Sequence, residues 1–438
     1  MQDTIEKQGF STQIIEVSFL DKIKDFTLQP KEELQGNLFE IAAINNQQDL
    51  DKTSIEEVDI GNIKTKKYLN EFWTPKQRQA NSIHEISYRA CFKPQLPRFF
   101  IEKLTKEGDY VYDPFSGRGT TIIEAALLNR QIIGNDINPL ARILSEGRLL
   151  IPDLLEVKKY LDKIPVNYSL KADIDLSMFY HSKTESEIVS IKNFILEKEK
   201  NNSLNSLDKW IRMVATNRLT GHSKGFFSIY SMPPNQAVTP DRQIKINEKL
   251  NQTPDYRNVK ELILVKSKAL IKDISIYKKQ SLEKIYKTAI FLNNNARKTP
   301  EVHDNFVQLT VTSPPFLNIV HYTSDNWLRC WFNGIHTKEI KITMSKKTSE
   351  WTALMQEVFI ELFRITKKGG YVAFEVGEIR NGKIKLDEHA LPLGIKAGFR
   401  LIGIIINEQK FTKTSNIWGI KNNKKGTNSN RIVLFIKE

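Results

Sequence analysis

The sequence contains little cysteine and no long apolar run, and both absences limit its class. Only Cys91 and Cys330 occur in 438 residues, too few for a disulfide framework or a cysteine-rich metal site. No segment reaches the ~20 consecutive apolar residues that cross a bilayer. The N-terminal stretch MQDTIEKQGF lacks the basic and then apolar pattern of a signal peptide. We therefore expect a cytoplasmic protein with no metal centre and no membrane contact.

Two nucleotide-binding signatures are also missing, although VYDPFSGRGTT (111–121) is a glycine-bearing loop. No Gly-Lys-Ser/Thr follows its glycines, so it is not a phosphate loop, and the third glycine of the dinucleotide fingerprint is absent. Gly117 and Gly119 still allow a tight turn and close approach of a ligand. Asp113 would repel a pyrophosphate and attract a cationic, methionine-type ligand.

A second acidic residue supports a nucleoside site. Asp136, 19 residues after Gly117 in GNDINP, ends the next predicted strand. An acidic side chain at that place accepts ribose hydroxyls in nucleoside-binding folds. The alternative is a tight turn on a packed sheet with Asp113 as a helix cap; the two acids at this spacing favour the ligand site.

The chain is basic, with a formal net charge of +14 at pH 7. Its 40% hydrophobic and 26% charged residues are ordinary for a globular protein. The excess of lysine and arginine favours a polyanionic partner such as nucleic acid. A lysine-rich surface also serves solubility, so charge alone leaves both interpretations open.

Strand and helix patterns alternate over 71–150 and again over 286–438, which predicts one α/β domain with a mostly parallel, Rossmann-like sheet. Strands are expected at 110–112, 131–135, 286–292, 306–311 and 371–376, with an antiparallel C-terminal hairpin at 401–407 and 431–436. Helices are expected at 120–130, 349–368 and 390–399. Ser349 is expected to cap the second helix and Gly369-Gly370 to end it.

Two other regions differ in composition. Residues 1–70 are polar and form an N-terminal extension, while 151–285 has few strand signals and reads as an inserted helical region. Within it, 217–243 (NRLTGHSKGFFSIYSMPPNQAVTPDRQ) is a loop rich in glycine, proline, aromatic and basic residues.

The stretch VTSPPF (311–316) makes a stiff corner at the end of a predicted strand, because neither a helix interior nor a central strand tolerates two consecutive prolines. It displays the Ser313 hydroxyl, the Pro314 carbonyl without a ladder partner, and the ring of Phe316. Pro314 and Pro315 keep these groups rigid.

Together, DPFSGRGTT, GNDINP and TSPPF resemble the amino-methylating DNA methyltransferases that use S-adenosylmethionine. The resemblance covers 71–150 and 286–438, which would then be the catalytic domain. The stretch HEISYRACFKPQLPRFF (84–100) resembles the segment that closes over the methionine moiety. The resemblance implies a cofactor site built from Asp113, Phe115, Ser116, Gly117, Gly119, Thr120, Thr121, Asp136, Asn295 and Thr312. Asn295 departs from the family, which commonly has Asp there; its amide oxygen can still accept a bond from the adenine amine.

The same resemblance makes Ser313, Pro314, Pro315 and Phe316 the catalytic corner. An exocyclic base amine is a poor nucleophile, because its lone pair is delocalised into the ring. The Ser313 oxygen and the Pro314 carbonyl can accept its two hydrogens, and Phe316 offers a stacking face for a base taken out of the duplex. No Pro-Cys pair occurs, which argues against ring-carbon methylation, and missing metal ligands argue against zinc deamination.

In the family a leading Ser goes most often with cytosine N4, whereas Asp or Asn goes with adenine N6. We therefore expect a cytosine-N4 DNA methyltransferase of a restriction–modification system, with adenine N6 as the alternative. An RNA base methyltransferase and a catalytically silent nucleic-acid-binding subunit remain lower alternatives.

The insertion lies between the cofactor motif and the catalytic corner, where the family places target recognition. Groove reading could use four residues of its central loop, Lys224, Tyr230, Asn235 and Gln236. Tyr322 lies near enough to the corner to line the pocket for the base. An internally packed loop is an equally good interpretation.

Overall fold

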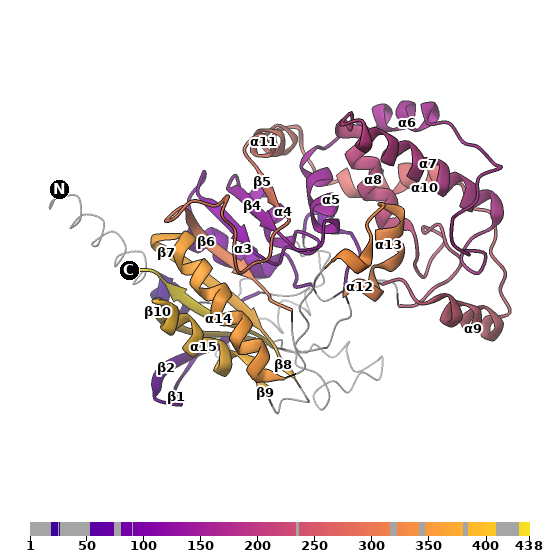
Figure 1. The fold of residues 1–438 in the computed structure, drawn as a ribbon. Coiled ribbons are helices and arrows are strands. Elements are labelled where there is room, and N and C mark those ends of the chain that lie inside the picture. Colours follow the sequence, from indigo (N-terminus) through magenta and orange to yellow (C-terminus); the bar gives the residue numbers. More distant parts are fainter. Residues whose placement is uncertain are drawn as a thin grey trace, which may run out of the picture.

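The protein is described by a computed structural model that covers residues 19–24, 26, 53–73, 80–89, 91–233, 236–315, 322–340, 347–379, 384–408 and 429–438 (Figure 1). Of the residues predicted to act in the site, Phe316 and Asn235 lie outside these ranges, and of Tyr322 only the backbone is described. None of the described helices has the length and apolar character needed to span a membrane.

Nine strands of the described chain form one sheet in the order β1-β2-β10-β11-β7-β6-β3-β4-β5. The neighbours from β5 to β7 are parallel, while β11 is antiparallel to both β7 and β10. This confirms the predicted α/β, Rossmann-like fold with an antiparallel C-terminal hairpin. The strands are β1 (Ser54–Ile60), β2 (Ile63–Asn70), β3 (Tyr110–Asp113), β4 (Gln131–Asn135), β5 (Ile290–Leu292), β6 (Val307–Thr312), β7 (Thr366–Val376), β10 (Arg400–Glu408) and β11 (Ser429–Ile436).

Helices cover both faces of the sheet, so the central strands are apolar on both sides (Figure 1). Alternate residues divide between two cores: Val111 and Ile132 belong to one, and Tyr112 and Ile133 to the other. The first core is completed by α3 (Gln95–Leu104), α4 (Thr120–Leu127) and α5 (Leu140–Glu146), and the second by α14 (Thr348–Ile365) and α15 (Leu386–Ala397).

The strand order reverses between β3 and β6. From β3 the chain moves outward through β4 to β5, and from β6 it moves the other way through β7. In open α/β sheets, ligands bind outside the carboxyl ends of the strands at such a switch point. The fold therefore places a site beside Asp113 and Thr312, the last residues of β3 and β6.

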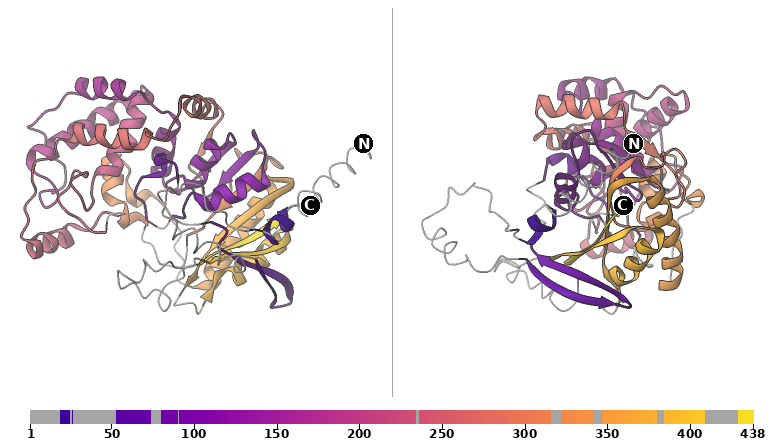
Figure 2. Two further views of the ribbon diagram at one scale, coloured as in Figure 1. Left: turned by 180° about the vertical axis from the view of Figure 1, so that it is seen from behind. Right: turned by 90° about the vertical axis from the view of Figure 1, so that its left-hand side faces the viewer.

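The inserted region folds into a separate group of helices beside the sheet (Figures 1 and 2). Trp210 is fully buried there and donates from its indole nitrogen to Ser267 Oγ at 2.9 Å. The helices are α6 (Leu154–Lys163), α7 (Ser182–Lys200), α8 (Ser206–Arg218), α9 (Pro240–Leu250), α10 (Val259–Ile271) and α11 (Ile276–Tyr286).

Two short helices that follow the catalytic corner, α12 (Tyr322–Asp325) and α13 (Trp327–Phe332), lie beside this group of helices (Figure 1). Arg212 Nε donates to Asn333 Oδ1 at 2.7 Å, and the Trp327 indole donates to the Val238 carbonyl at 3.1 Å. The segment after the corner therefore ties the insertion to the sheet.

Three local features differ from the sequence-based predictions. Residues 54–70, placed in the N-terminal extension, form the β1–β2 hairpin, and β2 extends the sheet by pairing in parallel with β10. Helix α14 has Lys347 at its N-cap position, so Ser349 is not the cap. Gly369 and Gly370 lie inside β7, which begins at Thr366, and do not end the helix.

Candidate active site

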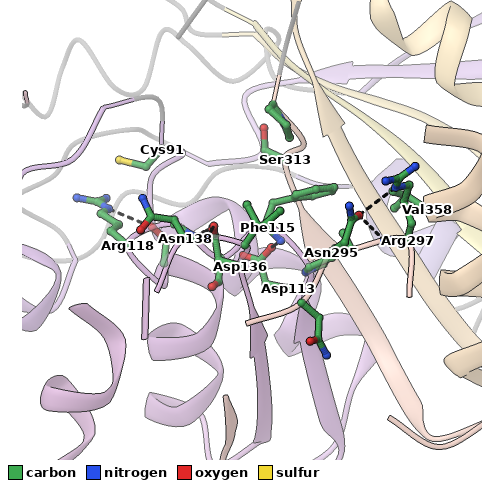
Figure 3. A pocket seen from close by; sticks show the side chains of 18 of the residues that line it. Cys91, Asp113, Phe115, Arg118, Asp136, Asn138, Asn295, Arg297, Ser313 and Val358 are labelled. Atoms are coloured by element: carbon green, nitrogen blue, oxygen red, sulfur yellow. Dashed lines mark hydrogen bonds between the residues drawn. The ribbon is translucent and has the colours of Figure 1, made fainter. Parts of the chain in front are cut away.

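A pocket opens at the carboxyl ends of β3, β4 and β6 (Figure 3). It holds about 1070 Å³ of empty space including its mouth, which is ample for a nucleoside-sized ligand. Its walls come from the glycine loop, Asp136, the turn after β5, the catalytic corner and one face of α14, with Leu354, Met355 and Val358. The predicted cofactor loop and the predicted corner thus share one cavity.

The glycine loop requires its glycines. Gly117 and Gly119 have φ angles of +50° and +75°, a backbone conformation that is strained for residues other than glycine. A Cβ on Gly119 would also collide with the Ser145 hydroxyl. Helix α4 begins directly after, at Thr120, so the loop turns the chain from strand to helix within a few residues.

Asp113 lies buried at the bottom of the pocket, with 1% of its surface exposed. Its Oδ1 accepts hydrogen bonds from the Phe115 N–H at 3.1 Å and from Thr312 Oγ1 at 2.6 Å. Burial raises the pKa of this carboxyl to about 7. A cationic ligand would favour its ionised form. Thr312, expected in the cofactor site, acts here as the link between β6 and Asp113.

Asp136 faces the same pocket from the end of β4. Its two oxygens accept from the backbone N–H groups of Gly117 and Asn138, each at 2.9 Å. Burial raises its pKa to about 6. A carboxylate has about four acceptor sites, so each oxygen can still accept a ribose hydroxyl. Asp136 also fixes the glycine loop through Gly117.

Asn295 lines the pocket in the turn after β5. Its Oδ1 accepts two bonds from Arg297, one from the backbone N–H and one from Nε, each at 3.1 Å (Figure 3). The oxygen expected to accept the adenine amine thus already stabilises its own turn. Of the other predicted cofactor residues, Phe115, Ser116 and Thr120 line the cavity, and Thr121 donates to the Val311 carbonyl at 3.0 Å.

The catalytic corner follows β6 immediately. Ser313 and Pro315 line the pocket, and Pro314 is buried between them. The Trp351 indole of α14 donates to the Pro315 carbonyl at 3.0 Å, which anchors the corner from outside. Figure 3 shows Ser313 on the side of the pocket that faces Phe115.

Glu375 is a site residue that sequence reasoning missed. It is 7% exposed in β7, where the neighbouring pair Thr312 and Phe374 puts it next to Ser313. The Ser313 hydroxyl lies beside its carboxylate, and Asn430 Nδ2 donates to Oε1 at 3.0 Å. Burial raises the pKa of Glu375. The signal was present: a lone carboxylate near the end of the apolar strand YVAFEV.

Of the predicted DNA-contacting residues, Lys224, Tyr230 and Gln236 lie on the insertion and do not line the pocket. Lys224 and Tyr230 are exposed and Gln236 is half-buried. The loop is also held internally, because Arg257 Nη1 donates to the Phe226 carbonyl at 3.0 Å. Each interpretation of this loop therefore finds support, because part of the loop is packed internally and its polar residues Lys224 and Tyr230 are exposed.

Comparison with known proteins agrees with this geometry. A family model described as DNA methylase matches residues 20–144, and one described as RMKL-like methyltransferase domain matches 85–218. The type II methyltransferase M.BsoBI of Geobacillus stearothermophilus is 24% identical over 60% of this chain and 55% of its own. The type II methyltransferase M.MjaII of Methanocaldococcus jannaschii is 33% identical over 20% of this chain and 16% of its own. These matches agree with the resemblance of the sequence motifs to the amino-methylating DNA methyltransferases.

Two further matches are weaker, one because it covers a short segment and one because its sequence identity is low. A tRNA (guanine(10)-N2)-dimethyltransferase of M. jannaschii is 32% identical over 20% of this chain and 24% of its own. A TehB-like SAM-dependent methyltransferase from Corynebacterium glutamicum covers 78% of this chain and 87% of its own, at 8% identity and a TM-score of 0.27. The chain spans about half the length of M.BsoBI and less of the other curated relatives named here.

The cofactor of the methyltransferases that this chain resembles is S-adenosylmethionine, and the pocket suits it. The cofactor combines a cationic sulfonium and amine, a ribose and an adenine. The buried Asp113 and the half-buried Asp136 supply acceptors at one end. Ala296, Leu354 and Val358 supply apolar contact at the other.

Proposed function

We propose that this protein transfers a methyl group from S-adenosylmethionine to the exocyclic N4 amine of cytosine in duplex DNA, within a restriction–modification system. It would work in the cytoplasm on double-stranded DNA, with a restriction endonuclease as a functional partner. Residues 71–150 and 286–438 would form the catalytic domain, and 151–285 the target-recognition region.

The observation that carries the proposal is the place of Ser313, which lines the pocket with the buried Glu375 carboxylate beside it. A hydroxyl has one hydrogen to donate. An ionised carboxylate only accepts hydrogen bonds, so the Ser313 hydroxyl would direct its hydrogen to Glu375 and its oxygen would accept toward the pocket. An exocyclic amine presents two N–H donors. The corner offers acceptors, so it suits an amine and not a base carbonyl, which itself only accepts.

The chain's own residues would act in a short sequence. Ser313 Oγ and the Pro314 carbonyl accept the two amine hydrogens and draw the nitrogen lone pair out of conjugation. The bound cofactor supplies an electrophilic methyl carbon. As the nitrogen–carbon bond forms, the carbon–sulfur bond breaks, and the methylated nitrogen then loses one proton to water. Phe316 is expected to stack on the extruded base.

Cytosine N4 is preferred over adenine N6 because Ser stands first in the corner motif. The family models and relatives support amino-methylation of DNA without distinguishing these bases. The deciding experiment is mass spectrometry of nucleosides from DNA methylated by the purified protein. N4-methylcytosine is expected; N6-methyladenine would overturn the base assignment, and 5-methylcytosine would overturn the mechanism.

A second candidate, methylation of an RNA base amine, is favoured by the match to the tRNA (guanine(10)-N2)-dimethyltransferase. The same assay separates it, with duplex DNA and bulk tRNA offered in parallel under radiolabelled cofactor. Label in tRNA alone would replace the DNA proposal. Cofactor binding without label in either substrate would favour the silent nucleic-acid-binding subunit.

A further inference from the structure

A segment N-terminal to the glycine loop forms one wall of the cofactor pocket. We call residues 82–89 with 91 and 92 the strap. Tyr88, Cys91 and Phe92 of the strap line the pocket. The Tyr88 ring stands 3.5 Å from the place where a Cβ on Gly117 would lie. The strap therefore touches the glycine loop across the region expected to hold the methionine part of the cofactor.

Both flanks of the strap are fixed to the catalytic domain. Arg118, buried between the two loop glycines, donates to the Ile86 carbonyl at 2.7 Å and to the Phe92 carbonyl at 3.5 Å. His84 Nε2 lies 2.7 Å from Glu124 Oε2 of α4. These contacts hold the strap beside the pocket but leave its centre, around Tyr88, to other partners.

The centre of the strap is held by the helical insertion. Asn217, 2% exposed in the last turn of α8, donates from Nδ2 to the Ser87 carbonyl at 2.9 Å and accepts from the Ser87 N–H at 3.2 Å. Arg329 of α13 adds a bond to the same carbonyl at 3.1 Å. The residue directly before Tyr88 thus has both of its backbone polar groups bonded by one side chain of the insertion.

The residue directly after Tyr88 is held as well. Arg89 Nη1 donates to both oxygens of Asp325, at 3.0 and 2.8 Å. Asp325 is 5% exposed at the end of α12, and its carbonyl accepts from the Ala237 N–H of the insertion at 3.0 Å. A partly buried ion pair therefore connects the strap to the segment that follows the catalytic corner.

We propose that Asn217 and Asp325 are positioning residues for the cofactor site, and that the helical insertion, through them, holds Tyr88 against the bound S-adenosylmethionine. Neither side chain lines the pocket. They act on the backbone at Ser87 and on the side chain of Arg89, the two neighbours of Tyr88. Cofactor affinity then depends on how the insertion is docked. This inference rests on the proposed function only in taking S-adenosylmethionine as the pocket's ligand.

The test is the dissociation constant for S-adenosylmethionine, measured by calorimetry on the full chain without DNA. Asn217→Ala removes two hydrogen bonds to the strap and should weaken binding on the order of tenfold. Asn217→Asp keeps the acceptor for the Ser87 N–H but not the donor, so an intermediate loss is expected. Melting temperatures of all variants establish the folded fraction.

The matched control is Asn247→Ala. Asn247 also lies in the insertion, donating to the Met178 carbonyl at 2.7 Å and accepting from Gln243 at 2.8 Å, but it does not touch the strap. It should lower the melting temperature without changing cofactor affinity. If Asn217→Ala and Asn247→Ala leave the dissociation constant equally unchanged, or weaken it equally, the positioning role is wrong.

A double-mutant cycle tests the ion pair. Arg89→Ala and Asp325→Ala should each weaken cofactor binding, and the double variant should be no worse than the poorer single variant, because both remove one interaction. Additive losses would overturn the pair as the connection. If the wild-type chain itself does not bind S-adenosylmethionine, the proposed function fails; if it binds and the variants bind equally, only this inference fails.

Discussion

Ser313 and Glu375 stand side by side at the ends of β6 and β7, with the serine hydroxyl beside the glutamate carboxylate. Their proximity follows from strand register, since Thr312 pairs with Phe374 one residue earlier on each strand. Glu375 is buried and also accepts from Asn430. The orientation of the hydroxyl at the corner is therefore set by a neighbouring strand.

Replacing Glu375 by Ala should lower the rate of methyl transfer about 10- to 100-fold, as expected for loss of a charge-assisted hydrogen bond. The freed Ser313 hydroxyl could then point its hydrogen at the base amine. Single-turnover transfer from radiolabelled cofactor measures this rate. Cofactor affinity should stay unchanged, and Ser313→Ala in the Glu375→Ala background should add little. An unchanged rate in Glu375→Ala would remove Glu375 from the site.

Cofactor binding should weaken as the pH falls through about 7 and then about 6. Burial raises the pKa of Asp113 to about 7 and that of Asp136 to about 6. Protonation then removes the negative charge that attracts the cationic ligand. Calorimetry between pH ~5.5 and ~8 should show affinity rising with pH, and Asp113→Asn should remove the upper step. A flat profile for the wild type contradicts this.

The same two carboxyls affect stability in the opposite sense. A carboxyl whose folded pKa is raised binds its proton more tightly in the folded chain than in the unfolded chain. The contribution of this proton to the free energy of unfolding is therefore fully present below pH ~4. For Asp113 it is lost as the pH rises to about 7. At pH ~8 Asp113→Asn should not lower the melting temperature, although it weakens cofactor binding.

Asp136→Ala should weaken S-adenosylmethionine binding by roughly 1.5–3 kcal/mol, the range for hydrogen bonds to a charged group. It removes the ribose acceptor and releases the Gly117 N–H, whose bond to Asp136 fixes the glycine loop at 2.9 Å. Asp162→Ala, an exposed carboxylate on α6, is the control. Equal affinities for Asp136→Ala and Asp162→Ala in calorimetry would contradict the assignment of Asp136 as the ribose acceptor.

Lys224→Ala should weaken DNA binding with little change in cofactor affinity. Lys224 is exposed on the loop of the insertion, and loss of one phosphate contact should reduce the slope of log affinity against log salt by about one. Fluorescence anisotropy at several salt concentrations measures it. Lys158→Ala, an exposed lysine on α6, is the matched control. The same slope in both variants would place the DNA contact elsewhere.

The sequence predicted those parts of the site that depend on neighbouring residues. Strand β4 was predicted at its observed bounds, since five residues run between a helix and an acidic strand end. Asp113, the glycine loop and Asp136 could be predicted because turn geometry and acid spacing are local properties. The corner was predicted because two prolines restrict the backbone whatever surrounds them.

What escaped prediction depends on pairing between distant segments. Strand β2 joins the sheet through β10, with Tyr68 opposite Ile405, and nothing near residue 68 indicates that partner. Gly370 was expected to end a helix, whereas a Cβ there would approach the Gln308 carbonyl to 3.0 Å. It permits close contact with β6 instead. Glu375 belongs to the site only through its neighbour on another strand.

The insertion also separates two neighbouring strands of the sheet widely in sequence. Strands β4 and β5 are neighbours in the sheet, and Asn135 donates to the Asn294 carbonyl across 159 positions of sequence. Contacts between residues so far apart in sequence form slowly, because the ends of a long loop must meet first. The wall of the pocket at Asn294 and Asn295 therefore depends on a pairing that spans the whole insertion. We expect a substitution that destabilises the insertion to slow completion of the cofactor site as well.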